Sequence, residues 1–114
     1  MTAPALRVTA DCGAARATLA LTGELDLDGA RPLRAALSTC YARRPRELLL
    51  DLRGLWFCDC AGLNVLLEAA VSARRLGVEL RVEGVHTQVA RLFTLVGADE
   101  VFASDGERLP PRIL

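Results

Sequence analysis

A buried strand that leads directly into an amphipathic helix constrains the fold of this chain more than any other feature. The residues from Leu48 to Leu52 are apolar except for Asp51, a pattern typical of a strand covered on both faces. We expect this strand to end in a turn at Arg53-Gly54 and a helix to follow after a short loop. Strand and helix in direct succession favour a sheet with parallel strands, because parallel neighbours need such a crossover.

The helix after this strand has clear start and stop signals. The carboxylate of Asp59 is placed to accept a hydrogen bond from the free amides of the first turn, which makes Cys60 and Ala61 the first helical residues. Gly77 is the expected stop. Apolar residues at helical spacing form one face: Leu63, Leu66, Leu67, Ala70 and Ala73. The junction of strand and helix is therefore the first candidate for a functional surface.

The part of the chain before this strand predicts a hairpin and a helix. Alternating residues indicate strands over Leu6–Ala10 and Ala17–Thr22, and Gly23 to Asp26 is expected to break the second strand. Asp26 or Asp28 then caps a helix with Pro32 in or near its first turn, and this helix ends between Tyr41 and Arg44.

The part after the long helix predicts a strand, a short helix and an edge strand. Strict alternation over Val78–Glu83 indicates the strand, and Thr87 is placed to cap a helix that Gly97 ends. Val101-Phe102 is a candidate short edge strand, and residues 107–114 form an expected tail after a domain over 4–106. The element order predicts a two-layer α/β domain with a mixed sheet of four to five strands and three to four helices.

Composition excludes several classes of function. A chain of 114 residues is one domain, and its 14 basic and 14 acidic side chains balance, so no large electrostatic attraction favours nucleic acid or anionic lipid. No apolar run approaches the ~20 residues of a membrane-spanning helix, and the amino end lacks the apolar core of a secretory signal. We therefore expect a cytoplasmic protein with reduced cysteines and no contact with nucleic acid or membrane.

Catalytic and metal-binding patterns are weak. His86 is the single histidine and is expected at a helix entry, and no nucleotide-binding glycine motif occurs. Cys58 and Cys60 lack a second cysteine pair at zinc-site spacing, and Cys58 is expected to face the core. We expect no catalytic residue, no metal and no cofactor, and hence no enzyme.

Four segments, in this order and spacing, resemble a STAS domain of the bacterial anti-sigma factor antagonist family. The resemblance covers the chain from Leu6 to Phe102. The family's fold, a mixed sheet with helices mainly on one side, agrees with the topology predicted above. The segments are Leu21-Thr-Gly-Glu-Leu-Asp26, Pro-Arg-x-Leu-x-Leu-Asp-Leu at 45 to 52, Phe-x-Asp-x-x-Gly-Leu at 57 to 63, and Val89-x-Arg-Leu-Phe-x-Leu-x-Gly97.

The resemblance implies a binding protein. Members of the family bind an anti-sigma factor, often a Ser/Thr kinase of the histidine-kinase-like ATPase type, and thereby free a sigma factor for transcription. Their switch is phosphorylation of the Ser that follows the Asp of an Asp-Ser-Ser-Gly or Asp-Ser-Thr-Gly loop. The added phosphate changes charge and desolvation at the edge of the docking surface.

This sequence departs from the family at the switch itself. Cys60 occupies the acceptor position, Ala61 replaces the second hydroxyl residue, and no Ser, Thr or Tyr occurs from Arg53 through Val71. We expect a retained docking surface without the phosphorylation switch. Two alternatives stay open: a thiol-based redox sensor built around Cys60, and a STAS module that binds a small ligand or joins a larger complex. For the redox sensor, the helix dipole favours a thiolate while the Asp59 carboxylate opposes it.

The remaining candidate residues surround this position. Trp56 is expected in the loop before the helix, where it either seals the core edge or anchors a partner. Glu24 and Asp26 flank the candidate docking face, with helix capping the alternative role of Asp26. Gly62 permits close approach of a strand or a partner, and Asn64 is expected to be exposed one turn after Cys60. We expect a monomer or a weak homodimer that associates through an edge strand or the hairpin.

Overall fold

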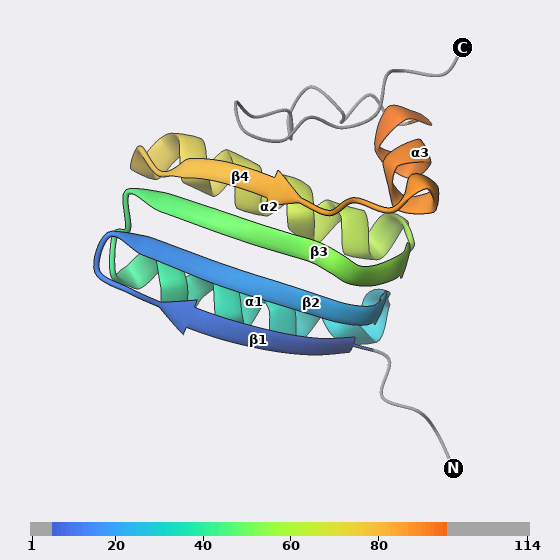
Figure 1. Cartoon of the computed structure of the whole chain (residues 1–114), viewed down its shortest axis with the longest axis horizontal. Coiled ribbons are helices and arrows are strands. Elements are labelled where there is room, and N and C mark those ends of the chain that lie inside the picture. Colours follow the sequence, from blue (N-terminus) through green and yellow to red (C-terminus); the bar gives the residue numbers. More distant parts are fainter. Residues whose placement is uncertain (1–5, 96–114) are drawn as a thin grey trace.

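The computed structural model describes residues 6–95, which form one mixed sheet and three helices (Figure 1). The strands lie in the order β1-β2-β3-β4; β1 pairs antiparallel with β2, whereas β2, β3 and β4 are parallel. This confirms the predicted two-layer α/β architecture. The elements in chain order are β1 Leu6–Cys12, β2 Arg16–Leu25, α1 Leu27–Ala42, β3 Glu47–Cys58, α2 Cys60–Leu76, β4 Glu79–Glu83 and α3 Thr87–Leu95.

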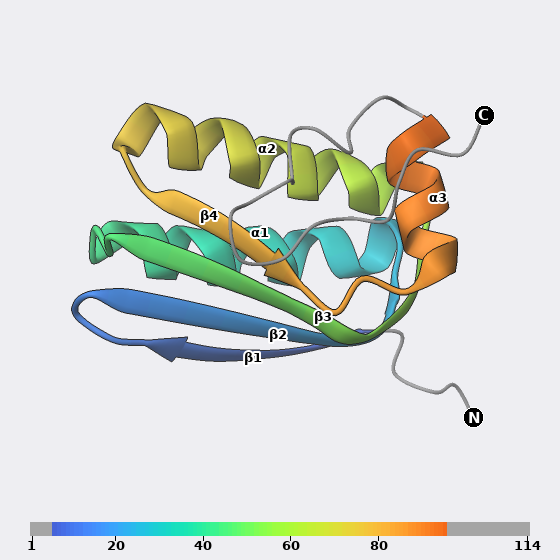
Figure 2. The ribbon, with the colours of Figure 1, turned by 45° about the horizontal axis from the view of Figure 1, so that its top comes forward.

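Helices α1 and α2 run side by side over one face of the sheet, and α3 lies at the end of the sheet where β3 ends (Figure 2). The core fills the space between the sheet and this helical layer. Alternate leucines of β2 and β3 point into it, including Leu19, Leu21, Leu48, Leu50 and Leu52, and all five are buried. Each fully buried leucine stabilises the fold by about 1.5–3 kcal/mol. The alternation in these two strands therefore fixes which face the helices cover. Strand β3 was expected to be covered on both faces, but Leu49 and Asp51 on its other face are only half-buried.

Local signals set the ends of α2, as predicted. The Asp59 side chain accepts from the Gly62 amide, and Gly77 closes the helix in the left-handed conformation with φ 72°. Glycine adopts this conformation without the steric cost that a Cβ imposes. Asp26, rather than Asp28, caps α1 by accepting from the Gly29 amide.

The predicted turn at Arg53-Gly54 is wrong, because β3 continues through both residues to Cys58. The strand accommodates them by register shifts against β2, between Ala20 and Thr22 and again between Gly23 and Glu24. A Cβ on Gly54 would lie 2.8 Å from Oγ1 of Thr22, so this glycine permits a close approach of strands rather than a turn. Trp56 consequently lies in β3 and not in a loop.

Two further boundaries differ from expectation. Strand β2 does not break at Gly23, which has φ 105° at the irregularity, but extends to Leu25. Pro32 is the sixth residue of α1 and lies in its second turn, because the helix already begins at Leu27. The predicted stop at Gly97, the edge strand at Val101-Phe102 and the tail at 107–114 fall outside the described residues.

Two thiols and one phenol are buried in their protonated, neutral form: Cys40 and Tyr41 on α1, and Cys58 at the end of β3. Burial raises the pKa of Cys40, Cys58 and Tyr41 to about 12 in each case. The Tyr41 hydroxyl donates to the carbonyl oxygen of Ala69 at 2.6 Å, which ties α1 to α2. All three groups keep their protons well above the pH at which they would lose them in an unfolded chain.

The free energy of unfolding should therefore fall as the pH rises from about 9 to 12, because the unfolded chain loses these protons first. The stabilisation is complete below the unfolded pKa values and disappears as the pH passes the folded ones. Urea unfolding at a series of pH values measures it. Tyr41→Phe should make the fall above pH ~10 shallower, while costing about 1 kcal/mol at neutral pH through the lost hydrogen bond. An unfolding free energy that stays constant from pH ~9 to ~11 would contradict this assignment.

Candidate functional site

The candidate site lies where β2 and β3 end side by side and helices α1 and α2 begin (Figure 1). Leu25 and Cys58 are paired in register at the last positions of their strands. Each is followed directly by an aspartate that caps a helix, Asp26 for α1 and Asp59 for α2. The backbone amide of Asp59 donates to the Leu25 carbonyl at 3.1 Å. Two helix N-termini with acidic caps thus lie next to each other at one end of the sheet, where its two inner strands end.

Cys60 is exposed at the first position of α2, immediately after its cap. Oδ1 of Asp59 lies 2.9 Å from the Gly62 amide nitrogen, which holds the carboxylate against the first turn. Cys58, two residues earlier, is buried as predicted, and its thiol contacts the Asp59 carbonyl oxygen at 3.4 Å. The two cysteines therefore face different environments, and only the Cys60 thiol presents itself to solvent.

Gly62 allows α2 to approach the end of β2. A Cβ at this position would lie 2.5 Å from Cγ of Leu25 and 2.6 Å from its carbonyl oxygen, closer than real atoms come. Gly62 is itself buried. The expected close approach is therefore to the neighbouring strand, and Gly62 positions Cys60 rather than reaching the surface.

The other predicted residues are gathered at the same end of the sheet. Trp56 is 58% exposed on β3, Glu24 is half-buried opposite Phe57, and Asn64 is exposed on α2. Leu27, the first residue of α1, is 73% exposed and was missed by sequence reasoning. Its signal was an apolar residue between two aspartates at a helix start. We call these residues together the junction surface: Glu24, Asp26, Leu27, Trp56, Asp59, Cys60, Ala61 and Asn64.

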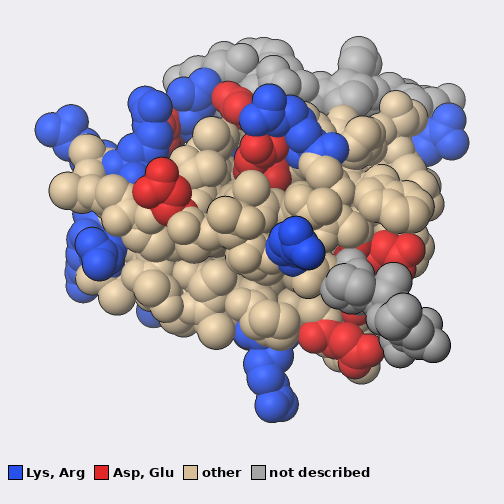
Figure 3. All heavy atoms as spheres, turned by 60° about the horizontal axis from the view of Figure 1, so that its bottom comes forward, with Lys and Arg blue, Asp and Glu red and all other residues tan. Residues whose placement is uncertain are grey.

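The junction surface combines acidic and apolar groups. Asp26 and Asp59 each complement the positive end of a helix dipole, and Asp28 adds a carboxylate in the first turn of α1. On the face drawn in Figure 3, acidic side chains gather near this end of the molecule. Exposed Leu27 and Trp56 supply apolar area at the same end of the sheet. Such a surface matches a partner that offers basic groups around an apolar patch.

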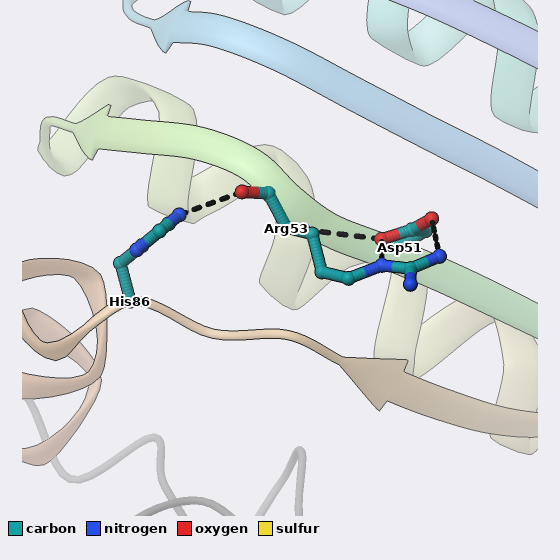
Figure 4. A network of polar contacts seen from close by, with 3 residues as sticks. All are labelled: Asp51, Arg53 and His86. Carbon is teal, nitrogen blue, oxygen red and sulfur yellow. Dashed lines mark hydrogen bonds and ion pairs between the residues drawn. The ribbon is translucent and has the colours of Figure 1, made fainter.

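His86 has a structural contact beside this site (Figure 4). Its Nε2 lies 2.6 Å from the Arg53 carbonyl oxygen and so ties the entry of α3 to β3. The Arg53 guanidinium pairs with both oxygens of Asp51, at 3.0 and 2.8 Å, and this pairing lowers the pKa of the Asp51 carboxyl. The His86 contact therefore joins β3 to the start of α3, whereas the pair of Asp51 and Arg53 lies within β3.

The described part of the chain, residues 6–95, was expected to hold neither a metal site nor a membrane span. No group of three or more His, Cys, Asp or Glu side chains within that range is arranged to hold a metal ion. No helix within it has the length and apolar character needed to cross a membrane.

A family model described as the Mlab STAS domain matches residues 8–109 of this chain. The chain belongs to this family of STAS domains. This confirms that the resemblance to a STAS domain found in the sequence is correct, since the match covers all four segments on which the resemblance depends. The observed fold, a mixed sheet with helices packed on one face, agrees with the fold expected for this family.

Similar proteins include one co-antagonist protein and two anti-sigma factor antagonists. The RsbT co-antagonist protein RsbRD of Bacillus subtilis is 28% identical over 100 residues, which are 87% of this chain but 34% of that protein. This chain thus spans about a third of its curated relative. An anti-sigma factor antagonist from Mycobacterium paratuberculosis has a TM-score of 0.71 and 24% identity, with 90% of this chain and 87% of that one covered. The unphosphorylated anti-sigma factor antagonist SpoIIAA has a TM-score of 0.73 and 18% identity, with 90% of each chain covered. This STAS domain shares its fold with these two solved structures.

Replacing Gly62 by alanine should destabilise the STAS domain by about 1–3 kcal/mol, because the new Cβ would collide with Leu25. This cost exceeds the ~1 kcal/mol by which alanine stabilises a helix relative to glycine. Urea unfolding measures the change. Asn64→Ala, an exposed position on the same helix, is the control and should be neutral or slightly stabilising. Equal effects of the two substitutions would show that Gly62 has no packing role.

Proposed function

We propose that this STAS domain is an anti-sigma factor antagonist that binds its partner through the junction surface and lacks the phosphorylation switch. The protein acts in the cytoplasm by competing for an anti-sigma factor and so regulates sigma-factor-dependent transcription. Its role is binding rather than catalysis. The observation that carries the proposal is the exposed Cys60 thiol, at the first position of α2, where the family has its phospho-acceptor serine.

The position suits a switch, but the side chain does not. A phosphate at a helix N-terminus meets free amides and the positive end of the helix dipole, and its charge of about −1.5 to −2 would join the carboxylates already at the junction surface. A Ser/Thr kinase transfers its phosphoryl group to a hydroxyl, and the sequence has none from Arg53 through Val71. The docking face therefore keeps one charge state whether or not the anti-sigma factor is a kinase.

The composition of the junction surface supports protein binding. Apolar anchors such as tryptophan contribute a large share of the affinity at interfaces, and Trp56 stands exposed on a rigid strand rather than on a loop. The carboxylates at the same end of the sheet steer a basic partner to the surface and add specificity. Since Cys60 is smaller than a phosphorylated serine and uncharged as a thiol, it leaves this surface open for constant binding.

Mixing the protein with a cognate anti-sigma kinase and ATP should leave the mass of the parent chain unchanged. Cys60→Ser restores the hydroxyl at an exposed position and should gain a single phosphate of about 80 Da by intact mass spectrometry. Asn64→Ser, also exposed on α2, controls for a hydroxyl placed nearby and should stay unmodified. Phosphate on the parent chain would overturn the lost switch.

The redox alternative is favoured by one observation, that Cys60 is the exposed cysteine among the four. It differs from the proposal in the response of partner binding to oxidant. The proposal expects the same affinity for the partner before and after hydrogen peroxide treatment. A redox sensor would lose affinity on oxidation and recover it on reduction, and its Cys60→Ser variant would keep its affinity in peroxide.

Trp56→Ala should weaken binding to the anti-sigma factor by tenfold or more, because truncating a central apolar anchor typically costs more than ~1.4 kcal/mol. Val71→Ala is the matched control, since Val71 is 57% exposed on α2 but outside the junction surface. Calorimetric titration measures both affinities, and circular dichroism verifies that both variants are folded. Similar losses in the two variants would place the interface elsewhere.

A further inference from the structure

A second pair of cysteines lies at the other end of the molecule, and neither has a part in the junction surface. Sγ of Cys12 and Sγ of Cys40 are 2.8 Å apart. Cys12 is half-buried at the end of β1, and Cys40 is fully buried near the end of α1. A disulfide needs its sulfurs at about 2.05 Å, so the two atoms have to move together by less than about 1 Å.

The fold itself aligns the two thiols. Cys12 pairs in register with Ala17, a core residue, and this places the Cys12 side chain on the face of β1 that the helices cover. On α1, Cys40 lies on the buried face with Leu33 and Leu37. The contact depends on the packing of α1 across the hairpin, so the thiols meet only in the folded protein.

We propose that Cys12 and Cys40 form a reversible disulfide when the protein meets a low-molecular-weight disulfide such as oxidised glutathione. The Cys12 thiolate attacks one sulfur of the reagent, forms a mixed disulfide and releases one thiol. The Cys40 thiolate then attacks the Cys12 sulfur and releases the second thiol. The two cysteines are oxidised, the reagent is reduced to two thiols, and these two thiols carry away the protons.

The two cysteines have different tasks in this exchange. Cys12 is the one that a dissolved reagent reaches, because Cys40 has no exposed surface. Burial, together with the hydrogen bond to Cys12, raises the pKa of the Cys40 thiol to about 12, so the second step should quicken as the pH rises and more of Cys40 becomes thiolate. Nearby Arg43 partly offsets this effect.

The bridge would join the end of β1 to the end of α1 and leave the junction surface untouched. Figure 1 places the end of β1 and the end of α1 at one end of the sheet and the starts of α1 and α2 at the other. The disulfide would restrict the unfolded chain more than the folded one. The disulfide would stabilise the folded domain under oxidising conditions. It is separate from partner binding and can be tested without a partner.

The test is to incubate the purified full chain with oxidised glutathione, block remaining thiols with N-ethylmaleimide and measure the intact mass. We expect an internal bridge, seen as loss of two blocked thiols and about 2 Da, and a thermal midpoint higher by on the order of 5–10 °C. Trypsin should yield a cross-linked pair of peptides, residues 8–16 joined to residues 35–43, which dithiothreitol separates.

Three variants make the result specific. Cys12→Ser should lose the bridge and the thermal shift while remaining folded, since Cys12 is only half-buried, and Cys40→Ala should do the same. Cys60→Ser should keep both. A parent chain that carries glutathione on Cys12 or Cys60 without an internal bridge overturns the proposal, as does a bridge that also forms in urea-unfolded protein at the same rate.

Discussion

The close approach of Gly62 to Leu25 determines the geometry of the whole junction surface. With no Cβ at position 62, the first turn of α2 packs directly on the last residue of β2, and the Asp59 amide bonds the same Leu25 carbonyl. Asp26 follows Leu25 in the chain, so the cap of α1 is fixed relative to the cap of α2. A displacement of one helix start would therefore move the other. Rigid elements on both sides hold the exposed thiol in one position, which a docking surface requires.

The acidic character of this end of the sheet has a structural cause that is independent of the proposed binding. Two parallel helices that begin side by side bring two positive dipole ends together, and each carboxylate cap offsets about half an elementary charge there. Asp26 and Asp59 are thus needed to stabilise the helix starts whether or not a partner is present. The same carboxylates give the surface its negative charge. In the proposed docking mode, the two side chains that stabilise the helix starts would also contact the partner.

The sequence predicted the elements whose signals are local. The bounds of α2 were predicted correctly because Asp59 and Gly77 act within one turn of the helix. The ends of β2 and β3 were not predicted correctly. Gly23 and Gly54 are residues typical of turns, but here they lie at irregularities between paired strands. Which of these a glycine adopts depends on its partner strand, information that a local pattern lacks. The contact between Cys12 and Cys40 was missed for the same reason, since it depends on where α1 crosses the hairpin.

The exposure of Cys60 depends on the residue before it. In a continuing strand, Cys58 and Cys60 would lie on the same face, because side chains alternate with a period of two, and both thiols would be buried. Asp59 ends that periodicity by capping α2, so the chain turns at this residue and the next side chain points outward. The sequence contained this result, since the cap, the helix start and the apolar face of α2 were all predicted from residue types.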